Sequence, residues 1–472
     1  MWKLICFFLL FSGTVVAQNK PLLFNVDDLP QTLMSNPGAQ INFTGHIGIP
    51  LFSQIHLSAG STGADLYDIF ADDGGNINSR IQETMRNMDS RDYFSVNQQW
   101  EIVSLGWKLD KKNYLSTGIY QEMDAFAYFP KDPAILANEG NSNYLNEPFY
   151  FDDVSFTGEI MTVYHLGINH KFDKRLTVGA RAKFYSGIFN AESTGNTGRF
   201  TTYTTPNGRN VYRHEVVDLD VLINTSGFAP LKEEEGMTVE QATAELLSRS
   251  FFGGNVGFGL DLGLSYILDE QFILSGSVQD LGAVFQRKEV ENYRYFGAYE
   301  TSGIEPLFPD LDENDEAIPY WDDFEDEVDR NLRDQTTNQS YTTWRPIKAN
   351  FAMEYGFGPA FLPCNYLSVK KVRYMNLLGM QLSGVKRPKG FVYAFTTYWD
   401  RKINENQRFK LSYSLDDYSL TNIGLMYTRT FNKFNVYLAA NNLLAFPNLA
   451  KAHSASVQLG MQLVFNNLTS IK

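Results

Sequence analysis

The sequence has too little cysteine for a disulfide-stabilised fold, and it has no second long hydrophobic run. Two cysteines occur in 472 residues, and Cys6 lies in an N-terminal apolar stretch that we expect to be removed. Cys364 is then alone, which excludes an internal disulfide and a cysteine-based zinc site. No later stretch is apolar enough for a transmembrane helix, and the mean hydropathy is −0.27.

Catalytic and nucleotide-binding motifs are also missing. There are six histidines, and His165 and His170 are an odd number of residues apart, so on a strand they face opposite sides and cannot share a metal. No Gly-x-Ser-x-Gly elbow, P-loop or dinucleotide fingerprint occurs. We therefore expect no enzyme, no metal and no cofactor. A Ser–His pair assembled from distant strands is the enzyme alternative that the sequence leaves open.

Positive charge is scarce as well. The formal net charge is −14, and it becomes −15 (−14 − 1) when Lys3 leaves with the N-terminal stretch. A strongly acidic chain argues against nucleic acid or an anionic lipid surface as a partner.

The N-terminus has the pattern of a secretion signal. Lys3 is followed by the apolar run from Leu4 to Phe11, and Val15-Val16-Ala17 forms a small-residue cleavage site. The run is shorter than the roughly 20 residues of a membrane helix. We expect residues 1–17 to be a signal peptide and the mature chain to be exported.

The sequence is rich in stretches where apolar residues alternate with small or polar ones. Large apolar residues occupy every second position from Val256 to Leu268, and again from Ala455 to Phe465, with Gly, Ser, Asp and Gln between most of them. This period of two is typical of strands with one face in lipid and one face wet. Aromatic residues make up 14% of the chain, and membrane-spanning β-barrels carry girdles of aromatic residues at both membrane interfaces. The fold class predicted is all-β, a transmembrane antiparallel β-barrel in the outer membrane.

The turns predict the topology. Short polar turns occur at 110–113, 173–174, 269–270 and 432–433, and longer outer loops at about 61–98, 130–158, 191–253 and 289–345. About fourteen strands are predicted, near 42–60, 99–109, 112–129, 159–172, 175–190, 254–268, 271–288, 346–357, 371–384, 389–401, 406–416, 420–431, 433–443 and 454–466. The domain plan is an N-terminal plug segment at 18–41, the barrel at 42–466 and a periplasmic tail at 467–472.

Three segments within the outer loops have further predicted structure. Residues 198–205 and 210–224 form a β-hairpin that rises from the third loop. Thr238 to Arg249 is predicted to be helical, because Thr238 suits the N-cap of a helix and the residues after it form an apolar stripe. Ile81, Met85 and Met88 indicate a second helix in the first outer loop.

The segment from Asp28 to Gly38 ends in Asn36-Pro37-Gly38 immediately before the first strand. This arrangement resembles the start of FadL-type barrels, which include the fatty-acid transporter family and the PorV-like proteins of Bacteroidota. Over residues 20–466 the chain is most similar to an uncharacterised outer-membrane family of Bacteroidota within that group. The resemblance implies a fourteen-stranded barrel with an N-terminal segment in or under the lumen. Two features depart from the pattern: Gly38 replaces Ala in the motif, and the aromatic Phe465 lies seven residues before the C-terminus.

Three groups of residues are candidate sites. The first is the inner wall, since charged side chains facing the bilayer midplane cost about 2–4 kcal/mol for Arg or Lys. These side chains either select a solute or pair with one another and fill the lumen: Arg181, Lys183, Asp261, Lys348, Asn350 and Glu354. The second is the plug, which gates a ligand path or packs against the wall: Leu29, Leu33, Met34, Asn36 and Pro37, with Val26 beside them.

The third candidate site is an acidic stretch from Asp310 to Asp329. Its Asp310-x-Asp312-x-Asn314 opening is that of a calcium loop, and its dense carboxylates suit Ca²⁺. The pattern then fails, because Asp315 stands at the Gly position and Trp321 at the Glu position. Weak Ca²⁺ binding and a solvated acidic loop both remain open.

The resemblance implies two alternative functions. In the first, the barrel takes up or binds a small hydrophobic molecule, with outer membrane lipid around it and the plug as a gate. In the second, it is a non-transporting accessory barrel that docks a periplasmic or export-machinery protein.

Overall fold

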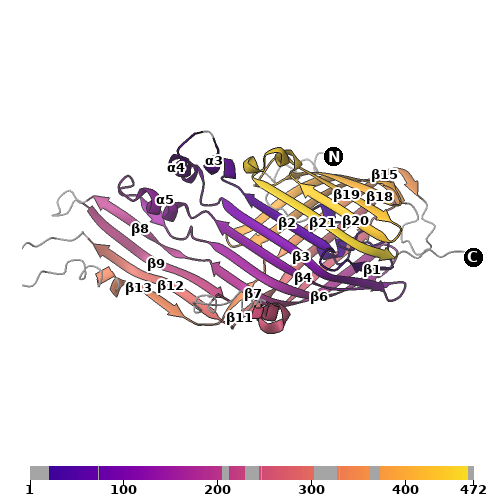
Figure 1. Cartoon of the computed structure of the whole chain (residues 1–472), viewed down its shortest axis with the longest axis horizontal. Helices are drawn as coiled ribbons and strands as arrows, with labels where there is room; N and C mark the ends of the chain where they lie inside the picture. Colours follow the sequence, from indigo (N-terminus) through magenta and orange to yellow (C-terminus); the bar gives the residue numbers. More distant parts are fainter. Residues whose placement is uncertain are drawn as a thin grey trace, which may run out of the picture.

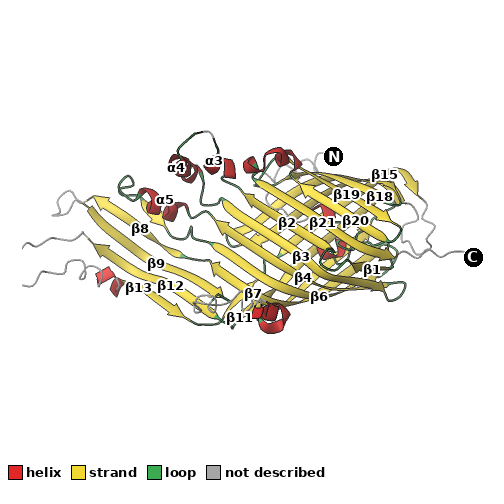
Figure 2. Cartoon of the chain, in the orientation of Figure 1, coloured by secondary structure: helices red, strands yellow, loops and turns green. Residues whose placement is uncertain are grey.

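The computed structural model describes residues 21–204 apart from 73, then 212–228, 244–301 apart from 246, 327–361 apart from 329, and 373–465. The predicted signal peptide 1–17 and the predicted tail 467–472 lie outside these residues. So do most of the acidic stretch from Asp310 to Asp329, including Asp310, Asp312 and Asn314, and most of the predicted helix Thr238 to Arg249. Strands dominate (Figures 1 and 2). The helical elements are η1 (Pro21–Leu23), α2 (Thr32–Ser35), α3 (Leu66–Phe70), α4 (Ile77–Asn87), α5 (Lys131–Glu139), η2 (Arg249–Gly253) and η3 (Leu443–Lys451).

The described strands join one antiparallel sheet. They are β1 (Gly45–Gly48), β2 (Gln54–Ser61), β3 (Tyr93–Lys108), β4 (Asn113–Tyr128), β5 (Pro148–Tyr150), β6 (Phe156–Lys171), β7 (Leu176–Ser193), β8 (Thr197–Thr204), β9 (Tyr212–Ser226), β10 (Asn255–Ile267), β11 (Phe272–Gln286), β12 (Val290–Thr301), β13 (Leu332–Thr337), β14 (Tyr341–Trp344), β15 (Lys348–Phe361), β16 (Arg373–Arg387), β17 (Gly390–Asn404), β18 (Gln407–Leu415), β19 (Asn422–Phe431), β20 (Phe434–Asn441) and β21 (Ser454–Phe465).

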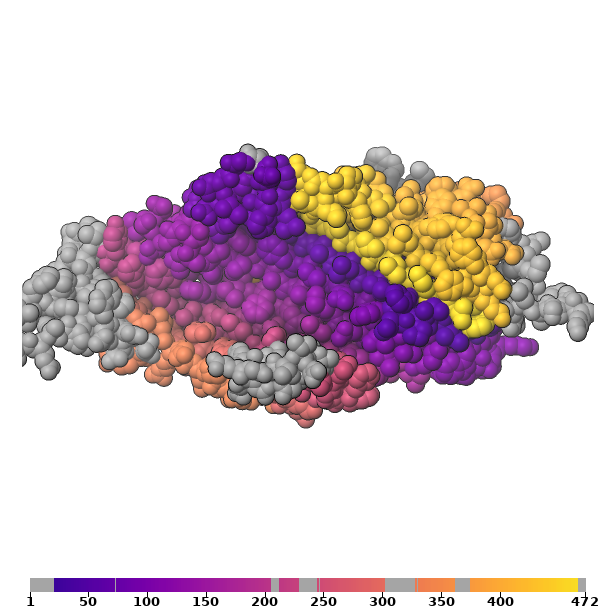
Figure 3. Space-filling view, viewed as in Figure 1, coloured from indigo at the N-terminus to yellow at the C-terminus, as the bar shows by residue number. Residues whose placement is uncertain are grey.

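The sheet closes into a barrel of fourteen strands, as predicted. β1 and β2 together form the first strand and pair with both β21 and β3, which closes the cylinder. In Figure 3 the yellow C-terminal strands run beside the indigo N-terminal ones. β14 and β15 likewise form one strand, since both pair with β11. The strand predicted at 42–60 is interrupted at 49–53 in the structure, between β1 and β2.

The short turns predicted at 110–113, 173–174, 269–270 and 432–433 lie at one end of the barrel, which we call the turn end, and the connections 62–92 and 129–155 lie at the other, the loop end. Aspartates build three of the short turns because each carboxylate accepts two backbone N–H groups. The Asp173 carboxylate accepts from Leu176 (2.8 Å) and Arg175 (2.6 Å), and these hydrogen bonds lower the pKa of Asp173. Asp110 and Asp269 make the equivalent contacts.

The two faces of the wall differ in the way that the alternation predicts. On β10, Phe258 and Leu264 are 59% and 45% exposed on the outer face, whereas Asp261 is 0% exposed on the inner face. On β21, Val457 is exposed while Gln458 and Gln462 are buried. The barrel therefore shows apolar side chains outward and polar side chains inward, which is the arrangement of a barrel in a bilayer.

One part of the sheet projects beyond the barrel at the loop end (Figure 1). It contains the predicted hairpin, β8 with β9, and adds β5, β12 and β13 to it. The stretch 289–345 therefore differs from the irregular loop expected from the sequence, since β12, β13 and β14 lie within it. The predicted helix around Ile81 and Met85 is confirmed as α4.

Candidate functional site

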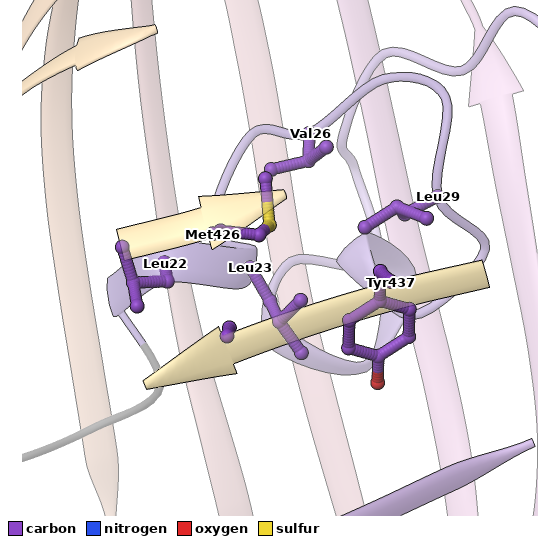
Figure 4. Packing of buried hydrophobic residues seen from close by; sticks show 7 residues of the cluster. Leu22, Leu23, Val26, Leu29, Met426 and Tyr437 are labelled. Atoms are coloured by element: carbon purple, nitrogen blue, oxygen red, sulfur yellow. The ribbon is translucent and has the colours of Figure 1, made fainter. Parts of the chain in front are cut away.

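The N-terminal segment, residues 21–41, fills the lumen and is called the plug here. Apart from η1 and α2 it has no regular structure, yet Leu22, Leu23, Val26 and Leu29 are all 0% exposed. Figure 4 shows these side chains packed against Met426 of β19 and Tyr437 of β20, in one cluster that also contains Ala439. The plug thus brings its own apolar core into the barrel.

The other predicted plug residues contact two further apolar patches of the inner wall. Leu33 packs in a cluster with Tyr114 of β4 and Val464 of β21. Met34 packs on a cluster of wall residues from four strands, which are Tyr120, Met161, Val163, Tyr185 and Val284. Together with Leu29, these contacts place the plug against wall patches on several sides of the lumen.

Asn36 and Pro37 fix the end of the plug to the wall through hydrogen bonds. The Asn36 side-chain amide donates to the Leu264 carbonyl (3.2 Å), and its oxygen accepts from the Gly38 N–H (2.9 Å). The Asn169 amide donates to the carbonyls of Pro37 (2.8 Å) and Ala39 (2.9 Å). The motif is therefore a wall-binding turn whose carbonyls are held by side chains of the barrel.

Glycines make this contact possible. A Cβ on Gly38 would stand 2.3 Å from the Gly263 carbonyl oxygen, and one on Gly179 would stand 2.0 Å from the Pro37 carbonyl oxygen. The plug backbone therefore lies directly on the wall backbone of β7 and β10. This close approach leaves no room for a side chain at position 38.

Arg181 joins the plug to an ion-pair network. Its guanidinium donates to the carbonyls of Leu33 (3.1 Å) and Met34 (2.8 Å), and its Nε donates to Asp261 (2.7 Å). Gln279 and Ser277 add hydrogen bonds to the carbonyl of Ser35. These three wall residues, Arg181, Ser277 and Gln279, bind the backbone carbonyls of α2 in the plug.

The network continues from Arg181 toward the loop end. Lys183 bridges Asp261 (3.0 Å) and Asp280. Lys348 bridges Asp280 (3.0 Å) and Glu122 (3.0 Å). Arg345 then pairs with Glu122 (2.9 Å) and Glu159, and Arg387 pairs with Asp124 beside them. Five cations thus meet five carboxylates, so the described part of the network carries no net charge.

Of the six residues predicted to face the lumen, Arg181, Lys183, Asp261 and Lys348 share this network. Asn350 and Glu354 are buried outside it: Gln381 donates to Asn350 (3.0 Å), and the Tyr398 hydroxyl donates to Glu354 (2.9 Å).

Sequence reasoning missed Glu122, Arg345 and Asp280. The alternation on the strand predicted at 112–129 puts Glu122 on the same face as Tyr120 and Asp124, so the pattern could have found it. Asp280 could not be found, because it occupies a β-bulge with φ of 60° and strand parity places it on the lipid face.

A second set of contacts holds the beginning of the plug. Arg408 of β18 pairs with Asp27 (2.6 Å), and Lys402 of β17 pairs with Asp28 (2.6 Å). The buried Lys410 ammonium donates to the carbonyls of Pro21 (3.3 Å) and Phe24 (2.8 Å). The plug is therefore fixed at both ends, on opposite groups of strands.

Two small cavities lie above the plug in the described lumen. One of about 60 Å³ is lined by network residues with Met34 and Ser35, and one of about 40 Å³ lies nearer the loop end, beside Tyr418. Arg387 lines both. Each is the size of a few water molecules, so the plug and the ion pairs leave little free space around these residues.

Among the described residues, no cluster of His, Cys, Asp and Glu has the arrangement of a metal site. No described helix is long and apolar enough to cross a bilayer.

Solved structures of other proteins are similar to this chain at low sequence identity. The Ralstonia pickettii toluene transporter TbuX is 10% identical, with a TM-score of 0.41 over 93% of this chain and 95% of that one. A Pseudomonas aeruginosa FadL homologue is 9% identical, with a TM-score of 0.41 over 96% and 97%. The P. putida toluene transporter TodX is 9% identical, with a TM-score of 0.37 over 96% of each chain.

No curated protein matches the chain. One family model does match, over residues 37–441, which is most of the sequence. The protein therefore belongs to the family of unknown function DUF5723.

Proposed function

We propose that this protein is an outer-membrane barrel that lets a small hydrophobic molecule through, with the plug as its gate. The observation that carries the proposal is an apolar layer inside the barrel at the level of the plug. Residues 1–17 act as the signal peptide in this proposal, and the loop end faces outward.

The apolar layer is unusual because the interior of such barrels is normally polar. Here Met426, Ala439, Met161, Val163 and Val284 form apolar patches on the inner wall, and the plug covers them. If the plug moved away, these patches would line the lumen. A hydrophobic solute would then bind to these patches, because contact between apolar surfaces removes both from water.

The plug is held by bonds that can break and reform. Its carbonyls accept hydrogen bonds from wall side chains such as Asn169, Gln279 and Arg181. A neutral hydrogen bond contributes about 0.5–1.5 kcal/mol, and one to a charged donor about 1.5–3 kcal/mol. Several such bonds keep the plug closed at rest and still permit a rare open state.

Deleting residues 19–37 tests the gate. The full-length protein and the deletion variant are reconstituted in planar bilayers, and conductance is recorded together with the binding of the fluorescent probe N-phenyl-1-naphthylamine in detergent. A heat-dependent mobility shift on a gel first shows that each barrel is folded. We expect a closed full-length protein and a deletion variant that both conducts and binds the probe saturably. A folded deletion variant that does neither refutes the gate and favours the accessory barrel.

A further inference from the structure

We propose that the outer wall of the barrel binds one anionic, phosphate-bearing membrane lipid, with an acyl chain in a surface hollow and the head group at Lys386. The hollow has a volume of about 650 Å³, which is in the range of specific ligand pockets. It crosses seven strands, β6, β7, β10, β11, β15, β16 and β17. This site does not depend on whether the plug is a gate.

The hollow exists because small residues interrupt the large apolar residues of the lipid face. Ala180, Gly276, Ala349 and Gly384 occupy outward positions on β7, β11, β15 and β16. Ala180 and Ala349 belong to one row of paired residues across the strands. In this row Ala180 pairs with Leu262, and Val278 pairs with Ala349. The rim is built from exposed apolar side chains, among them Ile168, Leu264, Phe351 and Leu382.

The direction of the hollow suits a lipid tail. It begins near the loop end at Phe391 and Tyr393 of β17, and it ends near the turn end at Ile168 and His170 of β6. Six steps between neighbouring strands, at about 4.8 Å each, give a length of roughly 29 Å. Because barrel strands tilt by about 35–45°, a chain lying across them descends into the bilayer core.

The head-group end carries a positive charge. Lys386 lies two residues beyond Gly384 toward the loop end, and its ammonium is 5.5 Å from the centroid of the Phe391 ring, which itself lines the hollow. In the part of the chain that the structure describes, no carboxylate forms an ion pair with Lys386. Although the whole chain is acidic, this rim therefore offers a cation and an aromatic pair where the head groups of the membrane begin.

Titration with lipid tests the site. The delipidated protein in mild detergent is titrated with phosphatidylglycerol or with phosphatidylcholine that has the same acyl chains, and bound lipid is counted by native mass spectrometry. We expect one lipid to bind well above the background, with phosphatidylglycerol preferred about tenfold. The Lys386→Gln variant should lose the preference and keep the binding, whereas Lys433→Gln at the turn end, whose ammonium also lies 5.5 Å from a ring centroid, should change neither.

Filling the hollow tests the acyl-chain part. A Cβ on Gly276 would be 3.5 Å from its nearest atom, so Gly276→Leu fits without a clash and occupies the hollow. It should weaken the binding of both lipids about tenfold. The matched control is Ala440→Leu, an outward position on β20 that lies outside the hollow. Equal lipid binding by Gly276→Leu and Ala440→Leu overturns the proposal, as does a wild-type protein that binds no lipid above background.

Discussion

A single methyl group at Gly38 should loosen the plug. In the Gly38→Ala variant the new Cβ would stand 2.3 Å from the Gly263 carbonyl oxygen and 2.6 Å from the Leu264 Cα. Both are backbone atoms of β10, a strand paired on both sides with β7 and β11, so they cannot yield as a flexible side chain would. The plug itself must move away from the wall.

The size of the effect follows from what such a movement breaks. Inserting a methyl group into a filled contact costs about 1–3 kcal/mol. Moving the plug instead stretches the bond from Asn36 to Leu264 and the two bonds from Asn169, each of which contributes about 1 kcal/mol. The middle of the insertion range and the loss of two of these three bonds each give about 2 kcal/mol, which raises the population of the detached plug about 30-fold.

Hydrogen exchange followed by mass spectrometry measures this population directly. Amides of residues 33–39 should exchange about 30-fold faster in Gly38→Ala, while the strands of the barrel should not change. The control is Gly158→Ala on β6, where the nearest atom to a new Cβ is 3.8 Å away. If both variants exchange at the wild-type rate over residues 33–39, the plug is not held by backbone contact at this point and the reasoning fails.

Three other perturbations have defined outcomes. Replacing Arg181 by Met leaves Asp261 buried beside Lys183 alone and should destabilise the barrel by about 3–5 kcal/mol in urea unfolding, whereas an Arg181→Met, Asp261→Leu double variant should recover part of that loss. Replacing Lys410 by Met removes two hydrogen bonds to the start of the plug and should make the N-terminus cleavable by an added protease. Burial, then the neighbouring Asp416, raises the pKa of Asp417 in the β18–β19 loop to about 6, above its unfolded value of 3.8. The folded state therefore holds an extra proton between these values, so thermal stability should fall as pH rises from 4 to 6, and Asp417→Asn should flatten that profile.

The barrel itself could be predicted from the sequence because its pattern is local. Alternation along β10 places Asp261 inside and Phe258 outside, and each strand repeats the rule without reference to its neighbours. The same reasoning placed Arg181, Lys183 and Lys348 on the inner face. Short turns were equally local, since an Asp carboxylate that accepts backbone N–H groups needs only the next few residues.

What could not be predicted depends on long-range register. The contact between Gly38 and Gly263 joins residues more than two hundred positions apart, and each glycine alone is only a small residue in a turn or a strand. Pairing of Arg408 with Asp27 needs the plug to be placed before the partners can meet. The part of the sheet that projects beyond the barrel was predicted only in part. Neither face of β9 is buried, so its apolar and polar residues alternate only weakly.

The balance of the ion-pair network bears on how the gate must work. A lumen that selects an ion keeps unpaired charges of one sign, whereas here Lys183 and Lys348 each lie between two carboxylates. Asp280 is turned inward by its bulge, and its backbone N–H donates to Asp261 at 2.7 Å, so the bulge itself helps to complete the network. Because Arg181 is shared between this network and the plug carbonyls, opening the gate leaves Asp261 its partners only if Arg181 stays with the wall. In the proposed gate the plug must then release the guanidinium, which breaks the bonds to the carbonyls of Leu33 and Met34.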